Sequence, residues 1–261
     1  MSLLEIHGAI CIPNQDLNGH ELQKFMNILG TALEYPEFIL ADDYLETQEI
    51  YAVQEFGNVK KDGTIDPDAY KSGTVWYQDG DLYQYPENLF YVLFNAKVVP
   101  PVGGDLAFKD LRKAYKDVDQ SIRDKYEGAT YIFDTEGNPD FANIPDADRI
   151  PKITHSTTFT HPVRGEKSFY LCSQYGKVEL KDGTIEPASV LYDLVVKETP
   201  QYVHKYTLND LVIYDDTQVL HETQGDYGNN GRLVLRGQSQ YKSKVDQIAR
   251  LFGKVAKMAS K

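Results

Sequence analysis

The chain has 261 residues, of which 41% are hydrophobic and 25% are charged. This is the composition of a globular protein, and it excludes a disordered or fibrous one. No run approaches the roughly 18 apolar residues of a membrane span, and the first residues lack the basic start and apolar core of a signal peptide. We therefore expect a cytoplasmic protein without a transmembrane segment. The formal net charge of −12 would repel a polyanion, so no nucleic-acid partner is expected.

The first half of the chain is predicted to combine strands with two helices. Short β-branched and aromatic runs between turn signals predict strands over residues 9–12, 49–53, 90–99 and 129–133. Asn18 is a suitable cap for a helix that runs to Leu29 and stops at Gly30, and a second helix is predicted over residues 108–118. Without a secretion signal, Cys11 and Cys172 are expected to be buried, reduced thiols.

The second half contains one more predicted helix and most of the chemically distinctive strands. The helix begins near Pro187, a residue that suits the first helical turn. Strands are predicted over residues 168–173, 202–207, 211–214 and 232–238. Together with 19 tyrosines, these many short strands indicate a mainly β (α+β) protein with flanking helices, built as a barrel or sandwich.

The last twenty residues differ from the rest. No linker divides the chain before them, so we predict a single domain over residues 1–241 and a basic amphipathic helix over residues 242–261. This segment carries six basic residues against one acidic residue, and apolar residues recur in it at helical spacing. It is expected either to dock on the acidic body of the protein or to bind a membrane surface or a partner.

Two arginines, Arg232 and Arg236, are four positions apart in an apolar run that alternates like a strand. Even spacing on a strand places both side chains on one face. Buried guanidinium groups need anionic partners, and arginine is suited to gripping a carboxylate through two parallel hydrogen bonds. The alternative is that both arginines lie on a solvated face while Leu233 and Leu235 point into the core. A histidine just beyond an apolar strand, His221, favours the first interpretation.

Five segments of the chain are each a weak signal of function alone, but their order along the chain is specific. They cover residues 76–80 (Trp-Tyr-Gln-Asp-Gly), 100–106 (Pro-Pro-Val-Gly-Gly-Asp-Leu), 161–167, 209–221 and 232–236. In this order the chain resembles the taurine / 2,4-dichlorophenoxyacetate type of Fe(II)/2-oxoglutarate-dependent dioxygenase. That family has a Trp-His-x-Asp-Gly-like segment, then Pro-Pro-x-Gly-Gly-Asp-Thr and His-Pro-x-Thr-Gly-Lys. A Gly-Asp-Leu-x-x-Trp-Asp-Asn…His strand and an Arg-x-x-x-Arg strand follow.

The resemblance implies a double-stranded β-helix, that is, a jelly-roll barrel, and assigns roles to residues. Asp79 and His221 would ligate iron, since two imidazoles and one carboxylate leave three positions for the keto acid and oxygen. Arg232 would pair with the far carboxylate of 2-oxoglutarate. Arg236 would lie near an acidic group of the substrate or assist the cosubstrate. Family members often associate, so a homo-oligomer is compatible with the resemblance.

Two positions depart from the family pattern: Tyr77 stands where the first histidine ligand is expected, and Leu106 replaces a threonine that helps to hold the cosubstrate. Three explanations for Tyr77 stay open. It ligates iron as a phenolate, as tyrosine does in catalase; or water or another side chain, such as His155 or His161, completes the site; or the site has lost its iron. Asp81 is the fallback carboxylate if the register of the segment is shifted by two residues.

The sequence therefore predicts a non-haem iron, 2-oxoglutarate-dependent oxygenase. It would use molecular oxygen to hydroxylate or otherwise oxidise a small, polar, anionic molecule. Because Asp79 is retained, no halogenase is predicted. The alternative is a catalytically silent relative, or one that does not use 2-oxoglutarate, that keeps a metal- or anion-binding jelly-roll pocket. His161 and Asp215 are expected to be hydrogen-bonding residues rather than ligands.

Overall fold

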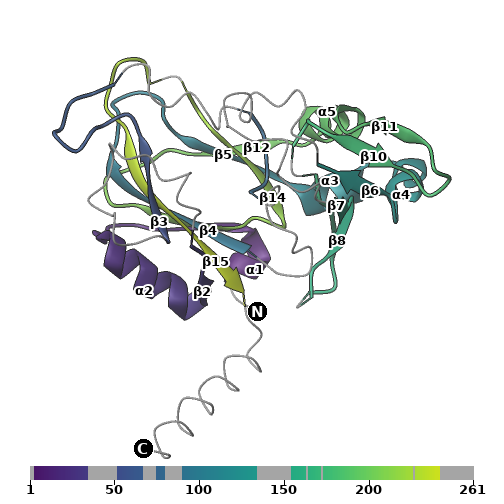
Figure 1. Cartoon of the computed structure of the whole chain (residues 1–261), viewed down its shortest axis with the longest axis horizontal. Coiled ribbons are helices and arrows are strands. Elements are labelled where there is room, and N and C mark those ends of the chain that lie inside the picture. The colour runs from purple at the N-terminus through teal and green to yellow at the C-terminus, as the bar shows by residue number, and fades with distance from the viewer. Residues whose placement is uncertain are drawn as a thin grey trace, which may run out of the picture.

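The computed structural model describes residues 3–34, 52–66, 75–79, 90–133, 154–162, 164–171, 173–225 and 227–241. Within these residues the protein is mainly β, with helices at the outside of the sheets, as the sequence predicted (Figure 1). The predicted C-terminal helix over 242–261, Cys172, Asp81 and most of the strand predicted over 49–53 lie outside the described residues.

The larger sheet is antiparallel and has six strands in the order β1-β13-β4-β15-β2, with β3 also pairing with β15. The strand β15, which carries Arg236, pairs with β2, β3 and β4, so it lies in the interior of the sheet. The strands are β1 (Ala9–Ile12), β2 (Gly30–Ala32), β3 (Val53–Gly57), β4 (Phe90–Val98), β13 (Leu211–Asp215) and β15 (Leu233–Tyr241).

A second antiparallel sheet packs against the first. It has the order β12-β5-β14, with β12 (Gln201–His204), β5 (Leu106–Asp110) and β14 (Val219–Thr223). One buried cluster contains apolar residues of both sheets, among them Phe94, Val212 and Val234 from the first and Leu106 and Phe108 from the second. The apolar layer between two sheets is where the alternating hydrophobic residues of the strands are removed from water.

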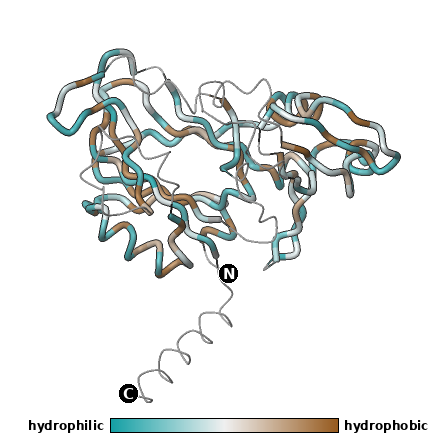
Figure 2. The backbone as a smooth tube through the Cα atoms, in the orientation of Figure 1, coloured by the Kyte–Doolittle hydropathy of each residue, from teal (hydrophilic) through white to brown (hydrophobic). Residues whose placement is uncertain are grey.

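The other face of the six-stranded sheet is covered by α1 (Leu3–His7) and α2 (Gly19–Leu29) (Figure 1). The predicted cap at Asn18 is confirmed: its side chain accepts a hydrogen bond from the backbone of Glu21 at 3.0 Å, and the Glu21 carboxylate accepts one from the backbone of Asn18 at 2.9 Å. Hydrophobic and hydrophilic residues alternate along α2 (Figure 2). Leu22 and Met26 of this helix are fully buried against the sheet.

A group of shorter strands and helices lies beside the two sheets (Figure 1). A four-stranded sheet has the order β11-β10-β6-β7, and β8 pairs with β9. These elements surround a separate apolar cluster that includes Trp76 and residues of α3 and α5. The strands are β6 (Thr130–Ile132), β7 (Thr154–Ser156), β8 (Thr158–Thr160), β9 (Lys167–Phe169), β10 (Lys177–Glu179) and β11 (Ile185–Pro187), and the helices are α3 (Leu111–Asp117), α4 (Gln120–Tyr126) and α5 (Ser189–Glu198).

Two predicted helices are present but begin later than predicted, and one prediction about a side chain was wrong. The helix predicted over 108–118 begins only at Leu111, because residues up to Asp110 pair with two neighbouring strands, and the Asp110 side chain then accepts from the first backbone amides of the helix. The third helix begins at Ser189, near Pro187 as predicted, but Pro187 itself ends β11 and is not part of the first helical turn. Cys11 is exposed rather than buried, because β1 is an edge strand.

Candidate functional site

The segment around Tyr77 is fixed to β14 by the backbone. The amide of Tyr77 donates to the carbonyl of His221 at 3.0 Å, and the amide of His221 donates to the carbonyl of Tyr77 at 3.0 Å. Their rings lie side by side, with centroids 4.1 Å apart. Gln78 anchors the same segment, since its side chain donates to the carbonyl of Asp216 at 2.5 Å and accepts from the amide of Leu171 at 2.8 Å. These contacts hold Asp79 at the histidine.

Asp79 and His221 meet as predicted, and a third residue joins them. The Oδ2 atom of Asp79 lies 3.7 Å from Nε2 of His221, and Oδ1 of Asp216 lies 3.7 Å from Nδ1 of the same ring. The three side chains each offer one ligand atom, and these atoms lie within 4.8 Å of one another. An imidazole and two carboxylates are ligands suited to a divalent transition metal. Asp216 was missed by sequence reasoning, although it directly follows Asp215 at the end of a strand.

Burial controls the protonation of this group. His221 is fully buried, and desolvation lowers its pKa to about 4, with the Arg236 charge adding to the effect and Asp79 opposing it. The imidazole is therefore neutral near pH 7, which is the form that binds a metal. Burial first, and then the charge of Asp79, raise the pKa of Asp216 well above its usual value. Both carboxylate oxygens of Asp216 accept from the backbone amide of Asp79, at 3.1 and 3.0 Å.

Arg236 lies in the same site and is buried. Its guanidinium forms an ion pair with Asp79 and donates to Oε1 of Gln54 at 3.3 Å. The phenol of Tyr214 also donates to Asp79, at 3.5 Å. Arg236, which was predicted to lie near an acidic group of the substrate or to assist the cosubstrate, therefore contacts Asp79, the carboxylate predicted to bind iron.

Arg232 is 1% exposed and is therefore more deeply buried than Arg236, which is 7% exposed. Its backbone amide donates to Asn58 at 2.8 Å, and its Nε donates to the carbonyl of Gly104 at 2.8 Å. Among the described residues, the Nη1 and Nη2 atoms have no hydrogen-bond partner. The guanidinium lies 5.9 Å from the ring centroid of Tyr206. The alternative of solvated arginines is wrong, because both faces of β15 are covered: Val234 and Leu235 are buried as well.

The remaining predicted residues have structural surroundings. Leu106 is fully buried in the apolar layer between the two sheets. His161 faces Asp215, with Nε2 and Oδ2 3.3 Å apart, and Asp215 also accepts from the amide and hydroxyl of Thr217. His155 lies on β7, edge to face with the ring of Tyr170. Neither histidine belongs to either of the two groups in the described part of the chain that could hold a metal ion, one of them Asp79, Asp216 and His221 and the other Cys11, His204 and Asp210.

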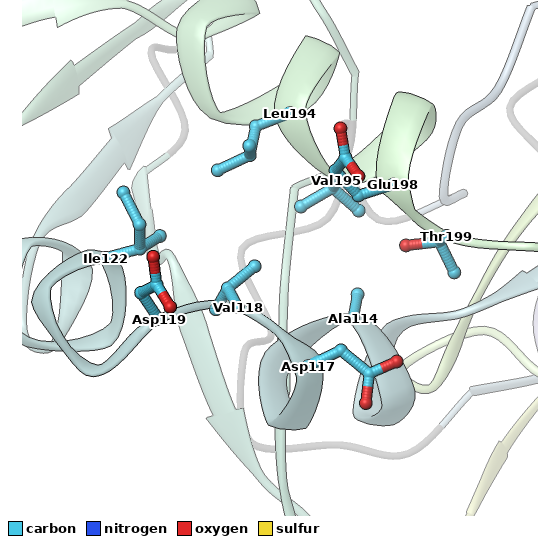
Figure 3. Close-up of a pocket in the computed structure, with 9 residues that line it drawn as sticks. All are labelled: Ala114, Asp117, Val118, Asp119, Ile122, Leu194, Val195, Glu198 and Thr199. Atoms are coloured by element: carbon cyan, nitrogen blue, oxygen red, sulfur yellow. The ribbon is translucent and has the colours of Figure 1, made fainter.

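A pocket of about 310 Å³ lies elsewhere, between α3, α4 and α5 (Figure 3). It has an apolar floor with carboxylates at its edge, and none of the predicted site residues lines it. The lining residues are Ala114, Asp117, Val118, Asp119, Ile122, Leu194, Val195, Glu198 and Thr199. This pocket is therefore separate from the group around His221.

Comparison with known proteins identifies the family of this chain. The model of the taurine catabolism dioxygenase TauD, TfdA family matches residues 1–239. The chain belongs to this family. Its members are α-ketoglutarate-dependent dioxygenases that use Fe(II) and 2-oxoglutarate.

Relatives in the TauD/TfdA family are distant in sequence. The chain is 26% identical over 202 residues to the α-ketoglutarate-dependent 2,4-dichlorophenoxyacetate dioxygenase of Cupriavidus pinatubonensis, covering 74% of this chain and 69% of the relative. It is 22% identical over 251 residues to an alkylsulfatase of Acinetobacter baylyi, covering 90% and 73%.

Solved structures share the fold of this chain. The structure of AAD-2 in complex with Mn(II) and N-oxalylglycine matches with a TM-score of 0.72 at 21% identity, covering 92% of this chain and 85% of that one. A taurine dioxygenase from Burkholderia xenovorans matches with a TM-score of 0.65 at 17% identity, covering 92% and 78%. In the described residues no helix has the length and apolar character needed to cross a membrane.

The residues present fit the family's metal and cosubstrate. His221 is neutral and has two buried ring nitrogens without a hydrogen-bond partner among the described residues, and a carboxylate lies near each of them. Arg232 holds a buried positive charge whose terminal nitrogens are unpaired in the same part of the chain. Leaving such groups unpaired is costly, so an anion at Arg232 and a cation at His221 would both be stabilised.

Proposed function

We propose that this protein is an iron- and 2-oxoglutarate-dependent oxygenase that hydroxylates or otherwise oxidises a small, polar, anionic substrate. The observation that carries the proposal is the convergence of Asp79 with His221, in a chain that also buries Arg232 with its terminal nitrogens unpaired among the described residues. When bound, iron and 2-oxoglutarate supply the oxidation of the substrate by molecular oxygen, with 2-oxoglutarate converted to succinate and carbon dioxide. The chain would bind and orient the reactants and exclude water from them.

Asp79 and His221 are the proposed iron ligands, with Tyr77 at the position of the family's first histidine. The ring of Tyr77 is close to that of His221, so its phenol is a candidate for the missing ligand. A water molecule is the other candidate, since His155 and His161 both have partners or packing elsewhere. Burial keeps the imidazole of His221 neutral. Two backbone hydrogen bonds between Tyr77 and His221 hold the Tyr77 segment against β14.

Arg232 is the proposed partner for the distal carboxylate of 2-oxoglutarate. Its Nε is held by the Gly104 carbonyl, which leaves the two terminal nitrogens to form parallel hydrogen bonds with a carboxylate. Leu106, which the resemblance assigns to cosubstrate binding, has only an apolar side chain to contribute there.

An anionic substrate is supported by Arg236 and by the relatives. A metal bound to Asp79 would neutralise that carboxylate and weaken its ion pair with Arg236, so the guanidinium could then serve a substrate anion. The relatives are named for 2,4-dichlorophenoxyacetate and for alkyl sulfates, both of which carry a negative charge near neutral pH.

The proposed fold around this site is a double-stranded β-helix. Its two halves would be the six-stranded and three-stranded sheets, which share one apolar layer and contribute Arg236 and His221. We also propose that residues 1–241 form one oxygenase domain in the cytoplasm, and that residues 242–261 are an appended segment.

Anaerobic addition of Fe(II) and then 2-oxoglutarate tests the function. We expect a weak visible metal-to-ligand charge-transfer band on addition of 2-oxoglutarate, and succinate when oxygen and a substrate are admitted. Omission of Fe(II) is the control. Absence of both the band and succinate, with carboxylate and sulfate candidates present, would contradict the enzyme assignment.

The second candidate function is a catalytically silent relative that binds an anion or a metal without turnover. The observation that favours it is Tyr77 in place of a nitrogen ligand, because fewer ligands weaken Fe(II) binding. In the experiment above, this candidate predicts a bound anion without the charge-transfer band and without succinate.

A further inference from the structure

Two buried hydroxyl groups, those of Thr223 and Tyr206, belong to residues linked to the surroundings of Arg232. Thr223 is 2% exposed and Tyr206 is 8% exposed. In the described part of the chain, neither Oγ1 of Thr223 nor the phenol oxygen of Tyr206 has a hydrogen-bond partner. A buried hydroxyl group without a partner costs roughly 1–3 kcal/mol. The terminal nitrogens of Arg232 also lack a partner in the same part of the chain. Together, these groups indicate a ligand that accepts hydrogen bonds.

The pairing of strands places both hydroxyl groups in one neighbourhood. The strands β12, β5 and β14 are neighbours in this order (Figure 1). Thr223 of β14 and His204 of β12 are both directly opposite Leu106 of β5. Residues directly opposite one another in neighbouring strands share a face of the sheet. Tyr206 follows His204 by two residues, and its backbone amide donates to Asp105 at 3.3 Å. Tyr206 follows β12 and Thr223 ends β14, so the two hydroxyl groups come from the two strands that flank β5.

Arg232 is tied to this neighbourhood through Gly104. Its Nε donates to the carbonyl of Gly104, whose amide donates to the carbonyl of Gln224 at 3.1 Å, next to Thr223. The guanidinium carbon also lies 5.9 Å from the ring centroid of Tyr206. Four donor atoms, from one guanidinium and two hydroxyls, are thus available in a region that excludes water.

We propose that Thr223 and Tyr206 donate hydrogen bonds to the same 2-oxoglutarate carboxylate that Arg232 binds. This inference rests on the proposed function and names the residues that complete its cosubstrate site. A carboxylate accepts about four hydrogen bonds, which matches the two terminal nitrogens of Arg232 and the two hydroxyl groups. Each bond to the charged group is stronger than a bond between neutral groups.

The position of Thr223 also accounts for Leu106. The family pattern has a threonine where this chain has Leu106, and a leucine side chain cannot donate a hydrogen bond. Its direct cross-strand partner, Thr223, supplies a hydroxyl group from the same face of the sheet. The site therefore still has a hydroxyl group at this place, but it comes from β14 instead of β5.

The test is 2-oxoglutarate binding to the Mn(II)-loaded full-length protein, measured by isothermal titration calorimetry. Thr223→Val keeps the shape of the side chain and removes the donor, so we expect its Kd to rise about 10- to 100-fold. Tyr206→Phe should weaken binding in the same direction. Thr223→Ser keeps the hydroxyl group and should bind within a few-fold of the wild type. Mn(II) affinity, measured by electron paramagnetic resonance, should be unchanged in all three variants.

A swap of the hydroxyl group separates hydrogen bonding from packing. Leu106→Thr in the Thr223→Val background should restore most of the lost 2-oxoglutarate affinity. Wild-type affinity in Thr223→Val, or a double variant that is folded but as weak as Thr223→Val, would overturn this inference alone. A wild-type protein that binds Mn(II) but no 2-oxoglutarate would instead contradict the proposed function.

Discussion

Tyr77 stands where the family has its first histidine ligand, and the surroundings of Tyr77 lead to a specific prediction. Tyr77→His would place a neutral nitrogen next to Asp79 and His221, because the segment is fixed to β14 through its backbone. We expect Mn(II) or Fe(II) binding to tighten on the order of tenfold, measured by anaerobic titration. Tyr77→Phe is the matched control and should leave the affinity unchanged. If Tyr77→Phe weakens metal binding instead, the phenol is itself a ligand.

Asp216 shows why one residue of the site could not be predicted. The family pattern has an asparagine at this position, and the sequence marks only an acidic pair after an apolar strand. In the structure, Asp215 points to His161 and Thr217, whereas Asp216 contacts the amide of Asp79 and faces His221. Asp215 ends β13 and Asp216 begins the turn that follows, and only the packed structure shows which of the two side chains contacts His221.

At the scale of elements, β15 and the turn before β5 act together. Gly104 has a φ of +71°, and a Cβ atom there would lie 2.9 Å from Cδ of Arg232. The turn therefore needs glycine both for its backbone conformation and for the close passage of the arginine side chain. The strand predicted over 232–238 was nearly correct, but its contact with this turn has no counterpart in the local sequence.

Gly104→Ala is expected to displace Arg232 and to raise the Kd for 2-oxoglutarate about tenfold or more, because a misplaced guanidinium loses its parallel hydrogen bonds. Gly183→Ala is the matched control, since Gly183 has a φ of +83° and open space where its Cβ would lie. Each variant should lose about 1–2 kcal/mol of unfolding free energy from backbone strain. Calorimetric titration and thermal unfolding separate the two effects. Equal 2-oxoglutarate affinity in both variants would show that Gly104 does not position Arg232.

At the scale of the whole molecule, the site residues lie within the two packed sheets and the segment that bridges them. Tyr77 is the first of the predicted site residues and Arg236 the last, and the last described strand ends at Tyr241. Deletion of residues 242–261 is therefore expected to leave Mn(II) and 2-oxoglutarate binding unchanged. Replacing the six basic residues of this segment with glutamine is the matched control for loss of charge. Loss of 2-oxoglutarate affinity on deletion would show that the segment belongs to the oxygenase domain.

The sequence by itself determined the mainly β class, the cap of α2 and the residue types of the site, because these depend on local patterns and on motifs with a fixed order. Through the family resemblance it also indicated Asp79, His221, Arg232 and Arg236 as candidate site residues. Only the tertiary structure decided that Arg236 pairs with Asp79, that Asp216 joins the metal group, and that Thr223 lies opposite Leu106. Each of these facts depends on strand register and on burial, which join residues far apart in the chain and are not encoded in any single segment.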